Sequence, residues 1–427
     1  MLQLPVKRLT TVLFFFSAIA AAQAQNATKE NAPYSRYGIG EIKEGGSMNL
    51  RGIGNAHAAY ANTHTVNTEN PASYSFLKLT TYEAGLEASL RSIQAGNGQD
   101  KYKSGTLALS YLNIGIPIGK NFGMALGLKP QSRVYYHIAD SSVIPGIGNT
   151  VRDYIGEGGL NYVYGGLAGK YKGFSLGFNL GYSFGTINNT NRLTNLDTTA
   201  VLNSEFLRQT NIGGLYWKGG AQYETRLNNT LGLRLGATAQ IEQSLNATRN
   251  DYRMQFYYGG NGGRVNDSAF ASGNISGKIV LPLSYSGGAQ LFGDNWNANL
   301  SFNATQWGNF RNFEQPDSLA SQTWSIQAGG EYTPDPLNLT KYLQRVTYRL
   351  GFSYGTDYVQ LRGQEMNYFT VAAGISFPFR RSTDRIHTVF EYGQRGTLKN
   401  ALLKESFYRF GVGISLNDRW FIKRKYD

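Results

Sequence analysis

The stretch that decides the fold runs from Phe174 to Gly185 and reads Phe-Ser-Leu-Gly-Phe-Asn-Leu-Gly-Tyr-Ser-Phe-Gly. Every second residue is a large apolar or aromatic side chain, and every residue between is Gly, Ser or Asn. A period of two predicts a β-strand with two different faces. The same alternation returns at 296–305, 369–377 and 408–416.

The second face of these strands is unusual because it carries so little charge. A soluble sandwich also alternates, but its outer faces are rich in Lys and Glu, whereas charged residues make up only 16% of this chain against about 25% in ordinary domains. A face of Gly, Ser, Asn and Thr suits a polar lumen with lipid on the other side. Strands survive in lipid only when the sheet closes on itself. The sequence therefore predicts an all-β fold, a transmembrane antiparallel β-barrel.

The links between candidate strands give a second, independent pattern. Short links such as 119–121, 172–173, 228–229 and 293–295 alternate with long polar ones, which are 93–105, 139–156, 188–209 and 245–276. Short periplasmic turns and long extracellular loops produce this alternation, which predicts that both termini are periplasmic. About fourteen strands are expected, an even number as bacterial barrels require, at 80–92, 106–118, 122–138, 157–171, 174–187, 210–227, 230–244, 277–292, 296–307, 322–332, 346–358, 367–379, 385–393 and 404–416.

The first 24 residues have the features of a bacterial signal peptide. Lys7 and Arg8 precede an apolar run over 9–22, and Ala22-Gln23-Ala24 supplies a cleavage site, so we expect the mature chain to begin at Gln25. A membrane anchor is the alternative, but the run is too short to span a bilayer. Export of this kind predicts the outer membrane of a Gram-negative cell.

Residues 25–79 do not alternate and are rich in Gly, Asn and Ala. The segment is too small for a domain with its own core. We interpret it as a hatch, or plug, folded into the lumen of a barrel formed by 80–427. A flexible periplasmic tail is the alternative, but disordered tails contain few aromatic residues, and this segment has Tyr34, Tyr37, Tyr60, Tyr74 and Phe76.

Several motifs in this order resemble the long-chain fatty-acid and aromatic-hydrocarbon transporter family of outer-membrane barrels (FadL/TodX-like). The family has an Ala-rich element followed by Asn-Pro-Ala near its start, a tryptophan at a late strand end and a characteristic late pair of strands. The family more often has Gly after Asn-Pro-Ala, where this chain has Ser. The matching segments are 54–61, Asn70-Pro71-Ala72-Ser73, 306–310, 331–334 and 348–354.

The resemblance implies a fourteen-stranded barrel with an N-terminal hatch that takes up small hydrophobic molecules, such as fatty acids, passively. It also implies lateral exit into the membrane at a kinked third strand. The third candidate strand here contains Lys129 and Pro130, and Pro130 cannot donate a ladder hydrogen bond. Pro130 should lie roughly 20 Å above the periplasmic end, so these two residues are the predicted lateral gate. The alternative is that Pro130 lies harmlessly in the extracellular part of the strand.

By the same resemblance, the residues expected to form the hatch are Gly54, Asn55, Asn70, Pro71 and Ala72.

Catalysis finds little support in the sequence. The chain has no Cys and four His, no two of which have the spacing of a metal site. We expect no catalytic residues, no cofactor, no metal and no nucleic-acid partner. A weaker alternative is an outer-membrane lipid hydrolase that uses His387 or His137.

The expected partners are outer-membrane lipid and lipopolysaccharide, a hydrophobic small-molecule ligand and other envelope proteins. The main functional alternative is an accessory barrel that does not transport. Such a barrel holds a partner or cargo in a secretion or assembly complex of the outer membrane.

Overall fold

The fold is seen in a computed structural model that describes residues 30–43, 46–96, 100–197, 202–259, 261, 263–338, 340–380 and 382–420. The predicted signal peptide, 1–24, lies outside the described residues. The short elements are η1 (Pro33–Arg36), β1 (Glu41–Ile42), α2 (Met48–Gly52), η2 (Pro71–Phe76), η3 (Trp307–Asn309), β13 (Arg311–Asn312), η4 (Tyr342–Arg345) and η5 (Lys399–Ala401). The long strands are β2 (Thr80–Ala95), β3 (Asp100–Pro117), β4 (Phe122–Ile144), β5 (Gly148–Tyr171), β6 (Phe174–Asn195), β7 (Asn203–Arg226), β8 (Gly232–Gln240), β9 (Gln243–Tyr258), β10 (Arg264–Leu281), β11 (Ser284–Phe292), β12 (Trp296–Thr305), β14 (Thr323–Tyr332), β15 (Thr347–Thr356), β16 (Asn367–Pro378), β17 (Arg385–Gly396) and β18 (Lys404–Asp418).

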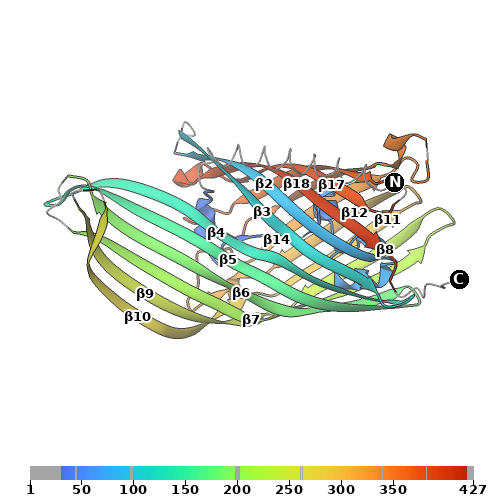
Figure 1. Ribbon diagram of the computed structural model, residues 1–427, viewed down its shortest axis with the longest axis horizontal. Coiled ribbons are helices and arrows are strands. Elements are labelled where there is room, and N and C mark those ends of the chain that lie inside the picture. Colours follow the sequence, from blue (N-terminus) through green and yellow to red (C-terminus); the bar gives the residue numbers. More distant parts are fainter. Residues whose placement is uncertain are drawn as a thin grey trace, which may run out of the picture.

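The strands form a closed antiparallel barrel (Figure 1). The last strand, β18, pairs with the first, β2, over fifteen residue pairs from Lys404↔Gln94 to Asp418↔Thr80. β8 continues into β9, and β10 continues into β11, so each couple is one interrupted strand. Counted in this way, the described part of the chain has fourteen barrel strands. The predicted fold class is confirmed, and each of the fourteen predicted strands corresponds to one of them.

The two faces of the wall differ as the alternation predicts. Along β6, Leu176 and Tyr182 point outward and are 68% and 46% exposed, whereas Ser175 and Ser183 point inward and are buried. Outward apolar side chains of this kind occur on every part of the wall and form a belt that suits lipid. No helix in the described part of the chain is long and apolar enough to cross a membrane.

One side of the barrel is much taller than the other. β5 and β7 have 24 residues each, whereas β14 and β15 have ten. The upper parts of β4, β5, β6, β7, β9 and β10 therefore continue beyond the barrel as a curved sheet, which we call the wall extension (Figure 1). The long loops predicted at 93–105, 139–156, 188–209 and 245–276 are wrong, because most of these residues lie in strands. Outside lipid both faces of a strand are polar, so the alternation that identifies a strand is lost.

The described residues that precede β2, 30–43 and 46–79, lie inside the barrel (Figure 1). Their side chains are mostly buried, and η2 contacts the inner faces of β4, β5, β6 and β7 while α2 contacts β15, β16 and β17. The described part of the predicted hatch therefore occupies the lumen.

Candidate functional site

The predicted hatch residues Asn70, Pro71 and Ala72 anchor the hatch to the wall. Asn70 caps η2, because its side-chain oxygen accepts a hydrogen bond from the Ala72 amide at 3.1 Å. Its amide nitrogen donates to the Ala58 carbonyl at 2.5 Å, within the hatch, and to the Ala237 carbonyl of the wall at 3.4 Å. An Asn cap followed by Pro at the first helical position is a common way to begin a helix. This motif therefore fixes how the hatch meets β7 and β8.

The hatch main chain lies directly against glycines of the wall. Gly54, with φ of +69°, approaches β15 so closely that a Cβ on Gly351 would lie 2.0 Å from the Gly54 nitrogen. A Cβ on Gly177 of β6 would likewise lie 2.4 Å from the Pro71 carbonyl carbon. Asn55, the remaining predicted hatch residue, accepts a hydrogen bond from His57 Nδ1 through its carbonyl at 2.9 Å. The Gly-rich inner face thus receives the hatch backbone.

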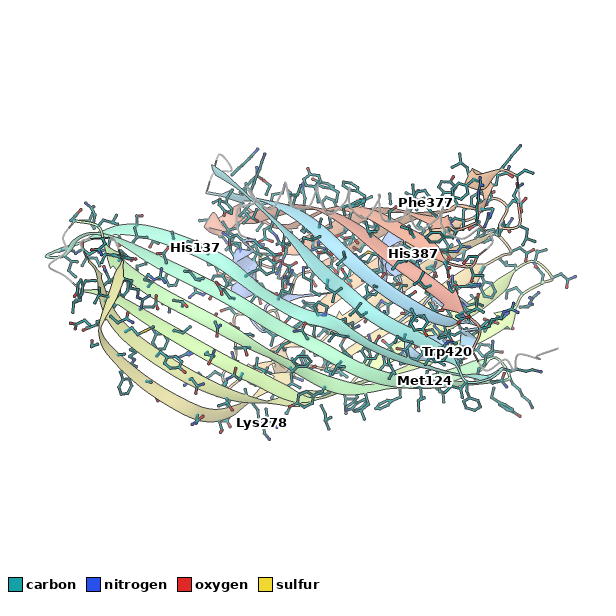
Figure 2. All side chains as sticks on the ribbon, in the orientation of Figure 1. Met124, His137, Lys278, Phe377, His387 and Trp420 are labelled. Carbon is teal, nitrogen blue, oxygen red and sulfur yellow. The ribbon has the colours of Figure 1, made fainter. Side chains whose placement is uncertain are left out.

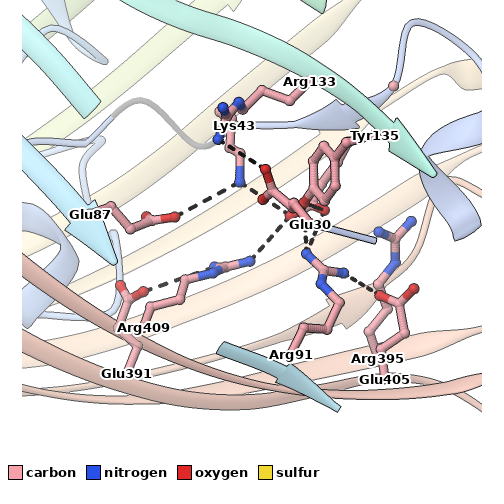
Figure 3. Close-up of polar contacts among 12 residues, drawn as sticks. Glu30, Lys43, Glu87, Arg91, Arg133, Tyr135, Glu391, Arg395, Glu405 and Arg409 are labelled. Atoms are coloured by element: carbon pink, nitrogen blue, oxygen red, sulfur yellow. Dashed lines mark hydrogen bonds and ion pairs between the residues drawn. The ribbon is translucent and has the colours of Figure 1, made fainter. Parts of the chain in front are cut away.

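A buried network of charges ties the start of the hatch to the closing ladder of the barrel (Figure 3). Glu41 of β1 accepts a hydrogen bond from Arg91 of β2 at 2.6 Å and also contacts the Tyr135 hydroxyl. Arg91 in turn pairs with Glu405 of β18. Although burial alone raises the pKa of the Glu41 carboxyl, Arg91, Lys43 and Arg409 hold it well below its usual range. The carboxylate therefore stays ionised and keeps its partners.

A second buried ion pair holds the helix of the hatch. Arg51 of α2 pairs with Glu391 of β17 and with Glu87 of β2, and its closest contact to each is 2.5 Å. All three side chains are at most 10% exposed. Because a charge buried without a partner is costly, α2 is held at one position in the lumen.

A third cluster combines two cations with one anion. Glu69 of the hatch contacts Lys129 of β4 and, at 2.9 Å, Lys218 of β7. Burial raises the pKa of Glu69, but the two lysines together hold it well below its usual range. His57 lies beside the same cluster, where burial and then Lys218 lower its pKa to about 4. The cluster therefore carries one net positive charge at neutral pH.

A cavity of about 400 Å³ lies between the hatch and the wall, and these charges face it. Its lining is mixed: Ser, Thr, Asn, Gln and charged side chains predominate, with aromatic side chains of the wall among them. A volume of this size is typical of a small-molecule site. The residues that line it include Glu69, Lys129, Pro130, Tyr162, Tyr216, Lys218, Trp307, Tyr358, Tyr368 and Phe407.

Lys129 and Pro130, the predicted gate residues, lie where β3 and β4 separate. These two strands pair only from Pro117↔Gly123 to Leu112↔Leu128. Beyond Leu128, β4 has β5 on one side, and the edge toward β3 has lost its strand partner. The ladder with β5 also shifts register between Pro130 and Ser132. We call the gap between β3 and β4 beyond Leu128 the seam.

The start of the hatch fills the seam. Ile42 pairs with Ser132 in an antiparallel bridge, the Lys43 amide donates to the Gln131 carbonyl at 3.0 Å, and the Ala32 amide donates to the Tyr135 carbonyl at 2.8 Å. Asn31 completes the contact by exchanging two hydrogen bonds with the main chain of His137, at 2.9 and 3.0 Å.

On the other side of the seam, Ser104 of β3 donates to the Asn31 carbonyl at 3.3 Å. The described chain therefore begins in the lumen beside the upper half of β4. The periplasmic location of the mature amino terminus stays a prediction.

A second interruption of the wall lies at Pro282, between β10 and β11. Residues 241–242 and 282–283 face each other without ladder pairing, between Gln240↔Ser284 and Gln243↔Leu281. The side chain of Gln243 replaces the missing strand partner, since its oxygen accepts from the Trp217 amide and its nitrogen donates to the Trp217 carbonyl, both at 2.8 Å. The proline thus marks the level at which the wall extension begins.

The two histidines of the hydrolase alternative lie on different parts of the molecule (Figure 2). His137 is on the wall extension, where its Nε2 lies 2.8 Å from Asp153. His387 is buried between Ser376 at 2.6 Å and Ser415 at 2.8 Å. His387, Ser376 and Ser415 do not line the cavity described above. No group of three or more potential metal ligands occurs among the described residues.

Sequence reasoning missed the charged partners of the hatch. Arg51 and Glu391 are 340 positions apart, and the register of the barrel alone brings them together. The signal that was available is the presence of charged residues on the Gly and Ser face of the strands, as at Arg91, Arg349 and Glu391.

The fold is similar to that of two solved outer-membrane proteins. The toluene transporter TbuX of Ralstonia pickettii matches with a TM-score of 0.55 and 13% identity, over 88% of this chain and 99% of its own. The toluene transporter TodX of Pseudomonas putida matches with a TM-score of 0.55 and 14% identity, over 90% and 100%. At these identities the likeness concerns the fold alone.

Sequence comparison gives a separate result. A search of curated proteins gave no match. The sequence model of one protein family, BamG, matches residues 6–427, which is nearly the whole chain. By this match, the chain belongs to the BamG family.

Proposed function

We propose that this protein is an outer-membrane channel for the passive uptake of small hydrophobic molecules, with lateral exit into the membrane at the seam. The observation that carries the proposal is the seam itself. A cavity of ligand size reaches Lys129 and Pro130, and the chain's own residues 31–43 fill the gap beside them. Movement of that one segment joins the cavity to the lipid.

The lining of the cavity indicates which molecules fit. Its aromatic side chains suit an apolar body, and the net positive charge of the Glu69, Lys129 and Lys218 cluster suits a single negative head. A fatty acid combines both properties. Toluene-like compounds use the aromatic part alone.

A reversible lock on the seam tests the proposal. The chain has no cysteine, and Ile42 and Ser132 are direct Cα partners, at the spacing a disulfide requires. We expect I42C/S132C to reduce the uptake of oleate and toluene at least five-fold when oxidised, and a reductant to restore it. The uptake is measured in cells that lack the native protein.

The matched control is T388C/V412C, whose two positions are partners in the continuous ladder of β17 and β18. This lock should leave uptake unchanged. If cells with the wild-type protein take up no more oleate or toluene than cells without it, transport is not the function. If both locks leave uptake intact, exit does not use the seam.

A specific observation also favours the accessory role. The wall extension stands on one side of the barrel only, and the buried ion pairs hold the hatch in place (Figures 1 and 3). A channel needs neither a tall one-sided wall nor a fixed plug. Native mass spectrometry of protein extracted in mild detergent distinguishes the two roles: a lone barrel with apolar ligand mass supports transport, and a stoichiometric complex without ligand supports the accessory role.

A further inference from the structure

The outer edge of β10 has lost its neighbour in the wall extension. β10 pairs with β9 along its whole length, but on the other side it pairs only at Ile279 and Val280, with β13. Beyond Lys278, no described strand pairs with that edge. From Arg264 to Ala271 every side chain is exposed, and up to Lys278 none is buried. The wall extension therefore ends in a free strand edge of about fourteen residues.

The direction of the free main-chain groups follows from one hydrogen bond. The Lys278 carbonyl accepts from the Phe313 amide at 2.9 Å, so the main chain of Lys278 points away from β9. Lys278 is opposite Asn246, and β9 runs without a register shift against β7. The main-chain N–H and C=O groups of Asn246 therefore point toward β7, and so do those of every second residue after it, including Tyr252 and Met254. The residues of β10 opposite Tyr252 and Met254 must then point their main-chain groups away from β9, as Lys278 does. These residues are Ala271 and Ala269.

The opposite edge of the same sheet shows what a free edge of this kind accommodates. There, β4 is covered by an extended segment of the chain itself, through the bridge at Ile42 and Ser132 and the main-chain hydrogen bonds of Ala32 and Lys43. Free edges are usually protected by Pro, Lys, a short strand or β-bulges. Between 264 and 277 there is no Pro and no Lys. Two register shifts, at 266/268 and 272/275, leave 268–272 regular between them.

The side chains around 268–272 define the occupant. Phe270 is 61% exposed and lies directly opposite Arg253 of β9, for which no ion pair is found in the described ranges. The small side chains of Ala269 and Ala271 lie on the opposite face of the strand, where they leave room for a partner's side chains. Of the basic residues of β9 and β10, Arg249 and Arg264 already pair with Asp251 and Glu205, so Arg253 is the charge that lies beside Phe270. An apolar side chain next to a carboxylate complements this surface.

We propose that the free edge of β10 at 268–272 binds an extended acidic segment of a second envelope protein by strand addition. The main-chain groups of Ala269 and Ala271 form the ladder. The partner places an apolar residue on Phe270 and a carboxylate on Arg253. With the short turns in the periplasm, this edge faces the outside of the cell. The proposal does not depend on transport through the lumen.

Site-specific cross-linking in intact cells of the native host tests it. Because the wild-type chain has no cysteine, A271C carries a maleimide diazirine probe at one position of this chain, and labelled cells with the wild-type protein give the background. We expect one main adduct, whose sequenced peptide comes from another envelope protein and has Asp or Glu within two residues of the cross-link. Adding A269P removes an edge-facing N–H without breaking the ladder to β9 and should lower the yield at least five-fold. A269S keeps the N–H and should not. R253Q should lower the yield several-fold.

Several results would overturn the proposal. These are an adduct to a second copy of this chain, an adduct to lipopolysaccharide alone, a yield that A269P leaves unchanged, and no adduct at all from a labelled protein. Heat-modifiable migration on a denaturing gel shows for each variant that the barrel has folded, so loss of the adduct is not loss of the fold.

Discussion

At the scale of single residues, the wall glycines set how closely the hatch can approach. A Cβ on Gly351 would lie 2.0 Å from the Gly54 nitrogen, so Gly351→Ala must push the hatch away from β15. Overpacking of this kind costs about 1–3 kcal/mol. We expect the barrel to fold while protease cuts the hatch faster than in wild type. Limited proteolysis in detergent measures the rate.

The control for this variant is Gly287→Ala. Gly287 lies in β11, and an added Cβ there meets nothing within 4 Å. Equal protease sensitivity of the two variants would contradict the close packing of the hatch main chain on the wall.

Acid should loosen the hatch through His57. Burial lowers the pKa of this imidazole to about 4, below the unfolded value of about 6.5. A displaced hatch therefore binds a proton that the seated hatch does not, and stability is lost as the pH falls from about 6.5 to about 4. The loss reaches about 3 kcal/mol at the acid end. Glu69 acts in the same direction, because its pKa is depressed.

Hydrogen exchange of the hatch amides between pH 7 and pH 4.5 measures this effect. H57Q should flatten the dependence between pH 6.5 and 4.5. H137Q, at an exposed histidine, should not. A dependence that H57Q leaves unchanged would assign the effect to Glu69 and the other carboxylates.

At the scale of elements, α2 depends on its ion pair. Arg51→Met removes the 2.5 Å contacts of Glu391 and Glu87 and leaves them only Arg409 and Lys43, each at 3.9 Å. Since breaking a buried pair outright costs about 3–5 kcal/mol, we expect a loss of up to about 3 kcal/mol. Thermal unfolding should show the loss. The matched control is Arg208→Met on the wall extension, where the pair with Asp251 is partly exposed and is expected to contribute less than about 1 kcal/mol.

The third strand of the barrel gives a prediction about the seam. Pro130→Val restores an amide where β4 leaves β3, which favours pairing across the seam. We expect uptake of oleate to fall at least two-fold, with the folded barrel unchanged. Uptake equal to wild type would mean that Pro130 has no part in the exit, which is the alternative that the sequence left open.

The strands were predictable where lipid or the hatch makes the two faces different. Leu176 is apolar because it faces lipid, and Ser175 is small because it faces the hatch. This difference between the two faces gives the sequence its period of two. In the wall extension no lipid covers the outer face, so 188–195 and 245–258 consist mostly of Asn, Thr, Arg and Tyr and show no clear period of two. The hatch motif at Asn70-Pro71-Ala72 was predictable from local capping rules. The partners of Arg51 and Arg91 were not, because barrel register sets them.

At the scale of the whole molecule, the hatch decides whether the lumen conducts. Deletion of 30–79 removes Glu41, Arg51 and Glu69 together and leaves the inner charges of the wall facing water. We expect this variant to form a barrel of lower thermal stability with a steady ion conductance in planar bilayers, while the full chain stays closed. A correctly folded deletion variant with no ion conductance would show that the wall alone closes the lumen.

The enclosed hatch also constrains the order of assembly. Residues 30–79 leave the ribosome before any residue of the wall, yet they end up enclosed by β2–β18 and held by Glu41 and Arg51. The ladder of β2 and β18, which bears Arg91 and Glu405, completes the enclosure. Biogenesis must therefore wrap the later sequence around the earlier one, and the hatch waits longest of all segments for its final contacts.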